Sequence, residues 1–167
     1  MGADGPGNGE LVTEAIERFR EAARARGIDP EIRRFPQGTR TAADAAAAIG
    51  CGLAQIVKSL VFLANDQAFL ALTSGANQAD TVRLGGFFGA REPARRATPE
   101  QAREATGFAI GGTPPFGHPR RLRVFVDRDL LGYEEVWAAA GTPDSVFPLT
   151  PQRLVQLSGG IVEDFKA

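Results

Sequence analysis

The sequence has a single cysteine, Cys51, and a single histidine, His118. One cysteine excludes an intrachain disulfide framework and any Cys-x-x-Cys motif, as is usual in a reducing cytosol. One histidine and one cysteine also exclude a zinc cluster and a multi-histidine metal centre. We therefore expect no metal site and no cofactor, and we expect Cys51 to be a structural thiol.

An excess of charge of either sign is also missing. The chain has nineteen Lys and Arg residues and twenty Asp and Glu residues, which gives a net charge of -1 at pH 7. This balance excludes a protein that coats nucleic acid through bulk charge and, without a helix-turn-helix pattern, argues against DNA as a partner. Lysine is scarce, because only Lys58 and Lys166 occur and the other seventeen cations are arginine.

Long apolar runs are absent as well. No run approaches the roughly 20 residues that span a bilayer, and the initial MGADGPGNGE lacks the basic start and apolar core of a signal peptide. We expect a cytoplasmic protein with no membrane partner. The composition of residues 1–9 predicts a flexible N-terminal segment, and residues 10–167 predict one domain large enough to bury a core.

Short helices and strands follow one another without a regular strand–helix–strand alternation. Local signals predict helices at 10–26, 41–50, 78–86 and 151–158, and one that begins at 98. Strands are predicted at 31–35, 55–63, 67–73, 121–127, 134–140, 145–149 and 159–164, with a hairpin turn at 65–66 and a polar edge strand or loop at 89–97. The expected class is α+β, with a curved, mixed or mainly antiparallel, barrel-like sheet and surrounding helices.

Lys58 lies in the middle of the apolar segment AQIVKSLVFLA, residues 54–64. In a strand its side chain shares a face with Ile56, Leu60 and Phe62. Because burial disfavours its charged form, such an ammonium needs a partner, a ligand or an opening to water. The alternative is that its stem crosses the edge of the core and its head reaches solvent. A lysine in a chain that otherwise uses arginine favours a site for a compact point charge.

Residues 107–119, GFAIGGTPPFGHP, form a second unusual segment. The glycines and prolines between Gly111 and Gly117 favour an irregular backbone whose N–H groups converge on an anion or a carbonyl oxygen. Such a loop is suited to stabilising an oxyanion. A plain tight connection between two strands remains the alternative.

Seven arginines lie in or just after the first predicted helix. They are Arg18, Arg20, Arg24, Arg26, Arg33, Arg34 and Arg40. They are candidates for a track of phosphate contacts along a nucleic acid, or else ordinary solvated charges balanced by neighbouring glutamates.

QIVKSLVF, followed about fifty residues later by GFAIGGTPPFGH, resembles the YbaK/EbsC family of trans-editing aminoacyl-tRNA deacylases. This family is similar to the editing domain inserted in bacterial prolyl-tRNA synthetase, and the resemblance extends from the first helix through GGIVEDF. It implies an α+β fold around a curved, barrel-like sheet. It also implies hydrolysis of the ester that joins a wrong amino acid to a tRNA, commonly a tRNA for proline.

The resemblance assigns roles to individual residues. Lys58 matches the essential family lysine, and Gly112 and Pro115 match the ends of the family's Gly-x-x-Pro loop. These three are the expected catalytic residues. The expected substrate-binding residues are Phe35, Ser59, Gly111, Thr113, Pro114, His118 and Ala139.

Ala139 marks a departure from part of the family. Members that remove cysteine often carry a serine before a Gly-Gly turn, where this chain reads Ala139-Ala140-Gly141. The departure favours a small apolar residue, such as alanine or 2-aminobutyrate, as the amino acid removed. Cysteine on tRNA(Pro) remains the alternative.

The implied reaction needs no triad, metal or active thiol, because an aminoacyl ester is already activated and water only has to be positioned. The expected partner is a mischarged tRNA, above all tRNA(Pro), and prolyl-tRNA synthetase is a second candidate partner. Two other functions remain open. One is a non-catalytic module that binds a tRNA end or a synthetase, and the other is a hydrolase of a small non-RNA ester.

Overall fold

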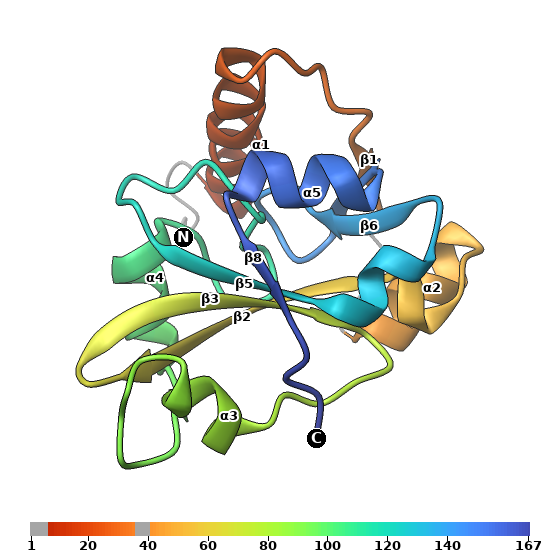
Figure 1. Cartoon of the computed structure of the whole chain (residues 1–167). Helices are drawn as coiled ribbons and strands as arrows, with labels where there is room; N and C mark the ends of the chain where they lie inside the picture. The colour runs from red at the N-terminus through yellow and green to blue at the C-terminus, as the bar shows by residue number, and fades with distance from the viewer. Residues whose placement is uncertain (1–6, 36–40) are drawn as a thin grey trace.

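The computed structural model describes residues 7–35 and 41–167, which form α-helices and short 3-10 helices around two sheets (Figure 1). The helical elements are α1 (Gly7–Ala25), α2 (Ala42–Ile49), η1 (Leu53–Gln55), α3 (Thr81–Gly86), α4 (Pro99–Thr106), η2 (Arg128–Gly132) and α5 (Pro151–Ser158). The strands are β1 (Arg33–Arg34), β2 (Val57–Ala64), β3 (Gln67–Ser74), β4 (Arg95–Arg96), β5 (Arg123–Asp127), β6 (Val136–Ala139), β7 (Ser145–Leu149) and β8 (Ile161–Glu163).

The larger sheet has five strands in the order β4-β2-β3-β5-β8. Its centre is the predicted hairpin, in which β2 and β3 pair antiparallel from Val57 opposite Ser74 to Ala64 opposite Gln67. Asn65 and Asp66 have φ angles of 50° and 62°, so both turn residues adopt the left-handed conformation that the favoured two-residue hairpin turn requires. β5 and β8 add in parallel, which makes the sheet mixed, as predicted.

The smaller sheet has the order β1-β7-β6, and its pairings are antiparallel. A single parallel bridge between Ile56 and Trp137 connects it to the start of β2. Within the described residues the two sheets are joined at this corner rather than closed into one continuous barrel. The α+β class is confirmed.

Both faces of the larger sheet are buried. On one face, Leu70, Leu72 and Val126 pack with Phe19 of α1 and Leu154 of α5 in the main core. On the other face, residues of β2, β3 and β5 pack with α3 and the C-terminal segment in a second cluster (Phe62, Phe69, Phe125, Leu84 and Phe165). Figure 1 shows α1 and α5 on one side of the sheet and α3 on the other. Burial on both faces explains why β2 and β3 are nearly continuous apolar runs.

The helix boundaries follow the predicted caps. Thr41 and Asp44 form the predicted capping box of α2, which ends at Gly50 with φ 86°. Thr98 and Gln101 cap α4 in the same way. α1 begins at Gly7, three residues before the predicted start, so residues 7–9 of the segment expected to be flexible are helical and residues 1–6 lie outside the described residues.

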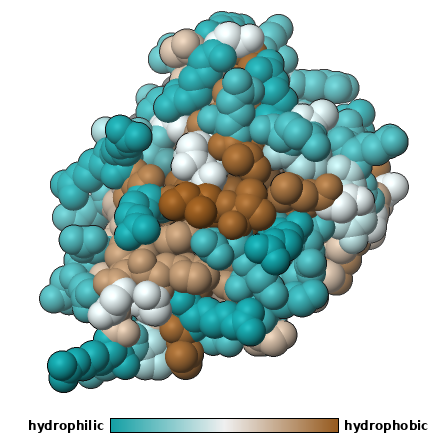
Figure 2. Space-filling view, in the orientation of Figure 1, coloured by the Kyte–Doolittle hydropathy of each residue, from teal (hydrophilic) through white to brown (hydrophobic). Residues whose placement is uncertain are grey.

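Figure 2 shows apolar surface gathered in the middle of the view of Figure 1, over the larger sheet, with hydrophilic side chains around it. The exposed large hydrophobic residues of the described chain include Leu131 of η2 and Ile161 of β8. In the part of the chain that the structure describes, no helix combines the length and apolar character needed to cross a membrane.

Candidate active site

A cavity of about 220 Å³ opens beside the first half of β2. Its walls come from the start of α2, from β2 and β4, from the Gly/Pro loop (residues 107–119) and from the β6–β7 hairpin. Among its lining residues are Lys58, Ser59, Arg96, Gly111, Thr113 and Ala139. Lys58 and the Gly/Pro loop, which are far apart in the sequence, therefore share one cavity.

β2 presents an open edge to this cavity. β3 pairs with β2 along its whole length, whereas β4 pairs with it at Phe62 and Leu63. On the β4 side, the carbonyl oxygen of Val61 accepts a 2.9 Å hydrogen bond from the N–H of Ala97. Main-chain groups of alternate residues face the same edge of an antiparallel strand, so the N–H and C=O of Ser59 point to the cavity side as well.

Lys58 is half-buried, and its ammonium reaches a main-chain acceptor. Its Nζ donates a 2.7 Å hydrogen bond to the carbonyl oxygen of Asn77, in the segment that follows β3. Burial is the main cause that lowers the pKa of Lys58 below its usual value, and the nearby Arg96 guanidinium lowers it further, whereas the Asp127 carboxylate opposes them. The sequence predicted an ammonium that needs a partner, and the structure supplies a carbonyl rather than a carboxylate.

Ser59 carries an unpartnered hydroxyl. Its Oγ is buried and has no hydrogen-bond partner among the described residues. Burying a hydroxyl without a partner costs about 1–3 kcal/mol. Ser59 lines the cavity, although its Oγ has no exposed surface there in the free protein.

Two glycines shape the Gly/Pro loop. α4 ends at Gly107, which has φ 81°, and the chain turns again at Gly111, which has φ 85° and lines the cavity. At Gly112 a Cβ atom would lie 2.6 Å from the Cα of Thr142, so only glycine fits against the β6–β7 turn. The loop is therefore held against the hairpin by backbone contact, which fixes where its N–H groups point.

Several predicted residues lie behind the cavity wall rather than in it. Gly112, Pro114 and Pro115 are buried and are not among the lining residues. The ring nitrogen Nε2 of His118 lies 2.8 Å from the carbonyl oxygen of Pro114, so His118 contacts the main chain of the loop. Burial, and to a lesser degree Arg26, lowers the pKa of His118, although the contact with the Pro114 carbonyl opposes this.

Phe35 also lies outside the lining. It packs against a cluster that includes Ala45, Ile56 and Trp137, which do line the cavity, and its N–H donates to the carbonyl oxygen of Asp144. Of the predicted site residues, the structure thus brings Lys58, Ser59, Gly111, Thr113 and Ala139 together in the cavity. Their catalytic and binding roles stay predictions.

Sequence reasoning missed many of the lining residues, among them Arg96, Ile110 and Trp137. Arg96 is exposed at the cavity, and its guanidinium carbon lies 5.6 Å from the centroid of the Phe62 ring. Its only sequence signal was the pair Arg95-Arg96 in a segment interpreted as a polar edge. Ile110 lies within the predicted loop segment, directly before Gly111, and Trp137 lies in the strand predicted at 134–140.

The cavity is cationic. Among the described lining residues Lys58 and Arg96 carry charge, and none is an aspartate, glutamate or histidine. No group of three His, Cys, Asp or Glu side chains in the described chain is arranged to hold a metal ion. Two cations and a glycine-rich backbone are suited to binding a phosphate or a developing oxyanion.

Arg18, within α1, and Arg26, directly after its end, contact the Gly/Pro loop. Arg18 donates to the carbonyl oxygen of Gly107 and lies over the ring of Phe108. Arg26 lies over the ring of Phe116. These two guanidinium groups hold the Gly/Pro loop against α1, which gives them a role that the predicted phosphate track did not include.

Comparisons with known proteins agree with this architecture. Residues 36–157 match the family described as "Aminoacyl-tRNA editing domain". The chain therefore belongs to the aminoacyl-tRNA editing domain family, which confirms the resemblance inferred from the Lys58 strand and the Gly/Pro loop.

Particular relatives add detail. The chain is 33% identical over 129 residues to the uncharacterized protein YwhH of Bacillus subtilis, covering 77% of this chain and 81% of that protein. It is 34% identical over 95 residues to the proline--tRNA ligase of Nitratidesulfovibrio vulgaris strain DP4, covering 57% of this chain but 16% of the ligase. The similarity to the ligases therefore concerns a small part of their length.

A solved structure proposed to be a trans-editing enzyme for prolyl-tRNA synthetase superposes with a TM-score of 0.86 at 47% identity, covering 92% of this chain and 97% of that one. The shared fold extends over almost the whole of both chains. The protein thus carries an aminoacyl-tRNA editing domain as a nearly complete unit of that fold.

Proposed function

We propose that this protein is an aminoacyl-tRNA deacylase that acts in trans on mischarged tRNA(Pro) carrying alanine or a similarly small residue. The observation that carries the proposal is the shared cavity, in which the Lys58 ammonium and the Gly/Pro loop flank one small hollow. Membership of the editing family supports the reaction class. The similarity to proline--tRNA ligases and to the structure proposed as a trans-editing enzyme supports the tRNA.

The reaction is hydrolysis of the ester between the amino acid and the terminal ribose. A water oxygen attacks the carbonyl carbon, the bond from that carbon to the ribose oxygen breaks, and the ribose oxygen takes a proton. Lys58 orients the carbonyl or the terminal phosphate, and N–H groups of the Gly/Pro loop face the developing oxyanion. One well-placed donor of this kind is worth about 3 kcal/mol of barrier.

The cavity dimensions favour a small amino acid. Its volume of about 220 Å³ is below the range of about 300–1,000 Å³ that is typical of sites for drug-sized ligands. An extra methylene gains only about 1–3 kcal/mol by attraction, so rejection of prolyl-tRNA has to come from steric exclusion. Ile110, Trp137 and Val146 supply bulky apolar wall for that exclusion.

The test is a deacylation assay on alanyl-, cysteinyl- and prolyl-tRNA(Pro), with alanine methyl ester as a substrate without RNA. Lys58→Ala is compared with Lys166→Ala, which removes the only other lysine of the chain. We expect rapid release of alanine by the wild type and by Lys166→Ala, and none above background by Lys58→Ala. The prolyl ester should stay intact.

Three other outcomes would each overturn a part of the proposal. Tight binding of tRNA without hydrolysis would identify a non-catalytic binding module. If cysteine is released faster than alanine, cysteinyl-tRNA(Pro) is the substrate instead. If alanine methyl ester is hydrolysed as fast as alanyl-tRNA(Pro), the protein is a hydrolase that does not need RNA. A prolyl-tRNA synthetase added to the assay would raise the rate if the enzyme works docked on that partner.

A further inference from the structure

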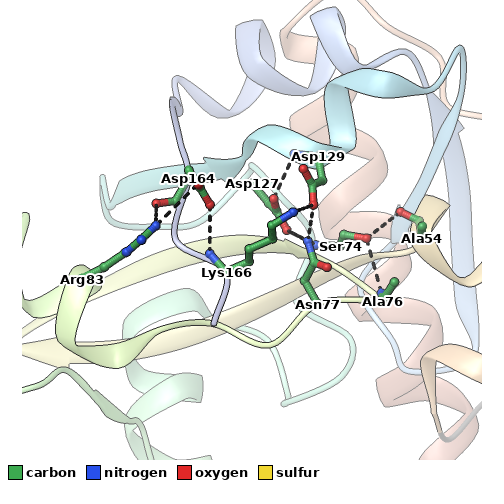
Figure 3. Close-up of polar contacts among 9 residues, drawn as sticks. All are labelled: Ala54, Ser74, Ala76, Asn77, Arg83, Asp127, Asp129, Asp164 and Lys166. Carbon is green, nitrogen blue, oxygen red and sulfur yellow. Dashed lines mark hydrogen bonds and ion pairs between the residues drawn. The ribbon is translucent and has the colours of Figure 1, made fainter.

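Asp127, at the end of β5, is a buried carboxylate with no place in the cavity lining. It is 1% exposed and accepts three N–H groups. Its Oδ2 accepts from the main chain of Ser74 at 3.0 Å and from Nδ2 of Asn77 at 2.9 Å, and its Oδ1 accepts from the main chain of Asp129 at 3.0 Å. Figure 3 shows these contacts converging from the end of β3, the segment after it and η2.

No Lys or Arg side chain of the described residues forms an ion pair with Asp127 at the distances of the other ion pairs in this chain. A buried carboxylate without a cation is expensive, so hydrogen bonds have to satisfy it. All three of its donors belong to the end of β3 and to the residues that follow β3 and β5. The Asp127 carboxylate therefore holds the segment at the end of β3 and the segment after β5 together.

Asn77 links this carboxylate to Lys58. Its main-chain carbonyl oxygen accepts the 2.7 Å hydrogen bond from the Lys58 ammonium. Its side chain is fixed at the same time, because Nδ2 donates to Asp127 and to Asp129, both at 2.9 Å. Its own N–H donates to the carbonyl oxygen of Ser74. The residue that holds the ammonium is thus clamped on its other side by the buried carboxylate.

We propose that Asp127 is a positioning residue for Lys58, which clamps Asn77 so that the Asn77 carbonyl holds the ammonium at the cavity. The proposal rests on the proposed function in so far as Lys58 serves deacylation there. Asp127 itself does not contact the substrate.

The charges around Lys58 agree with this arrangement. Arg96 faces Lys58 from β4 and Asp127 faces it from β5, and they act on the lysine pKa in opposite directions. Burial and Arg96 lower that pKa, whereas Asp127 raises it. Asp129, the other carboxylate on Asn77, is turned outward and pairs with Lys166 at 3.0 Å. Asp127 is thus the buried carboxylate that opposes the lowering of the Lys58 pKa.

The chain offers an unusually direct measurement, because it contains only two lysines. Protein labelled with ¹³Cε-lysine gives one signal from Lys58 and one from Lys166, and Lys166→Gln assigns them. The titration of each signal gives the lysine pKa, and ¹³C relaxation gives the order of the side chain. Deacylation of alanyl-tRNA(Pro) and thermal unfolding are measured on the same samples.

In Asp127→Asn we expect the Lys58 signal to titrate at lower pH and to lose order, with deacylation reduced by about 10²-fold, the usual cost of a displaced catalytic group. Asn77→Ala keeps the main-chain carbonyl and the Asp127 charge but removes the clamp. It should reduce the order of Lys58 and the rate with a smaller change in pKa. Lys166→Gln breaks the outer ion pair of the same network and should leave the Lys58 signal and the rate unchanged.

A folded Asp127→Asn with wild-type deacylation would overturn the proposal. So would a loss of activity while the Lys58 signal keeps its pKa and order, since that pattern indicates a purely structural role. If Asp127→Asn does not fold, Asn77→Ala decides by the same criteria. Should the wild type hydrolyse no aminoacyl-tRNA, the proposed function fails, whereas the lysine signals still test the clamp.

Discussion

Gly141 donates a 3.0 Å main-chain hydrogen bond to the carbonyl oxygen of Gly112, so the Gly/Pro loop meets the β6–β7 turn backbone to backbone. Both partners need to be glycine. A Cβ at Gly112 would lie 2.6 Å from the Cα of Thr142, and Gly141 has φ 116° and lies against the main chain of Ala15 in α1. The position of the loop beside Lys58 is therefore set by contacts between three distant segments.

Gly112→Ala should displace this loop. The methyl group has no room against Thr142, and overpacking of this kind costs about 1–3 kcal/mol of stability. Because the loop N–H groups move with it, we expect deacylation to fall by about 10²-fold or more. The measurements are urea unfolding and single-turnover deacylation. Gly86→Ala is the control, since a Cβ there meets no atom within 4 Å, and it should change neither quantity appreciably.

Ser59→Ala tests whether the unpartnered hydroxyl serves a ligand. The free protein loses no hydrogen bond within the described chain, so its free energy of unfolding should stay equal or rise by up to about 1 kcal/mol. The KM for alanyl-tRNA(Pro) should rise by about tenfold if the hydroxyl binds substrate. Ser158→Ala should instead lower the free energy of unfolding and leave the KM unchanged, because Ser158 Oγ accepts a hydrogen bond from the N–H of Gly160 after the end of α5. A stability loss in Ser59→Ala without a kinetic effect would contradict the assignment.

Ala139→Ser addresses the choice of amino acid. Ala139 lines the cavity and is half-buried, so a hydroxyl introduced at this position would face the cavity in which we propose that the aminoacyl group binds. We expect the ratio of kcat/KM for cysteinyl- over alanyl-tRNA(Pro) to rise by about tenfold, in line with the modest discrimination of one added polar contact. Ala47→Ser, on the exposed face of α2, is the matched control. An unchanged ratio would show that Ala139 does not determine which amino acid is removed.

His118 should couple stability to pH. Its pKa is lowered from the usual 6.5, chiefly by burial, so below that pH the unfolded chain binds a proton that the folded chain resists. Stability therefore falls as pH drops from 7 toward 5, by at most about 1.4 kcal/mol per pH unit for one proton. Urea unfolding at several pH values measures this slope. His118→Gln should flatten it, and an equal slope in both proteins would show that His118 does not cause the loss.

Local features of the fold were predictable because their causes are local. The capping boxes at Thr41 and Thr98 bond residues three positions apart, and the Asn65-Asp66 turn joins adjacent strands. The apolar character of β2 and β3 also predicted a buried hairpin. By contrast, the parallel addition of β5 and β8 depends on pairing between distant strands, for which no short segment carries a signal.

The candidate site was predictable in part. Lys58 stood out because a cation in an apolar strand is costly, and the Gly/Pro loop stood out through its composition. Arg96 did not stand out, because an exposed arginine beside another arginine looks like any solvated charge. The clamp from Asp127 through Asn77 was also missed, since its members lie on separate elements and their sequence surroundings are unremarkable.

The amino-acid sequence by itself determined most of the helices and strands of this protein, its editing-family membership and the identity of its unusual lysine, because periodicity, caps and motif residues act over a few positions. The tertiary structure alone decided that the lysine and the Gly/Pro loop share a cavity, that Pro115 and His118 lie outside its lining, and that the ammonium donates to the Asn77 carbonyl. These relations join residues that only packing brings together, and packing depends on the summed contacts of the whole chain rather than on any one segment.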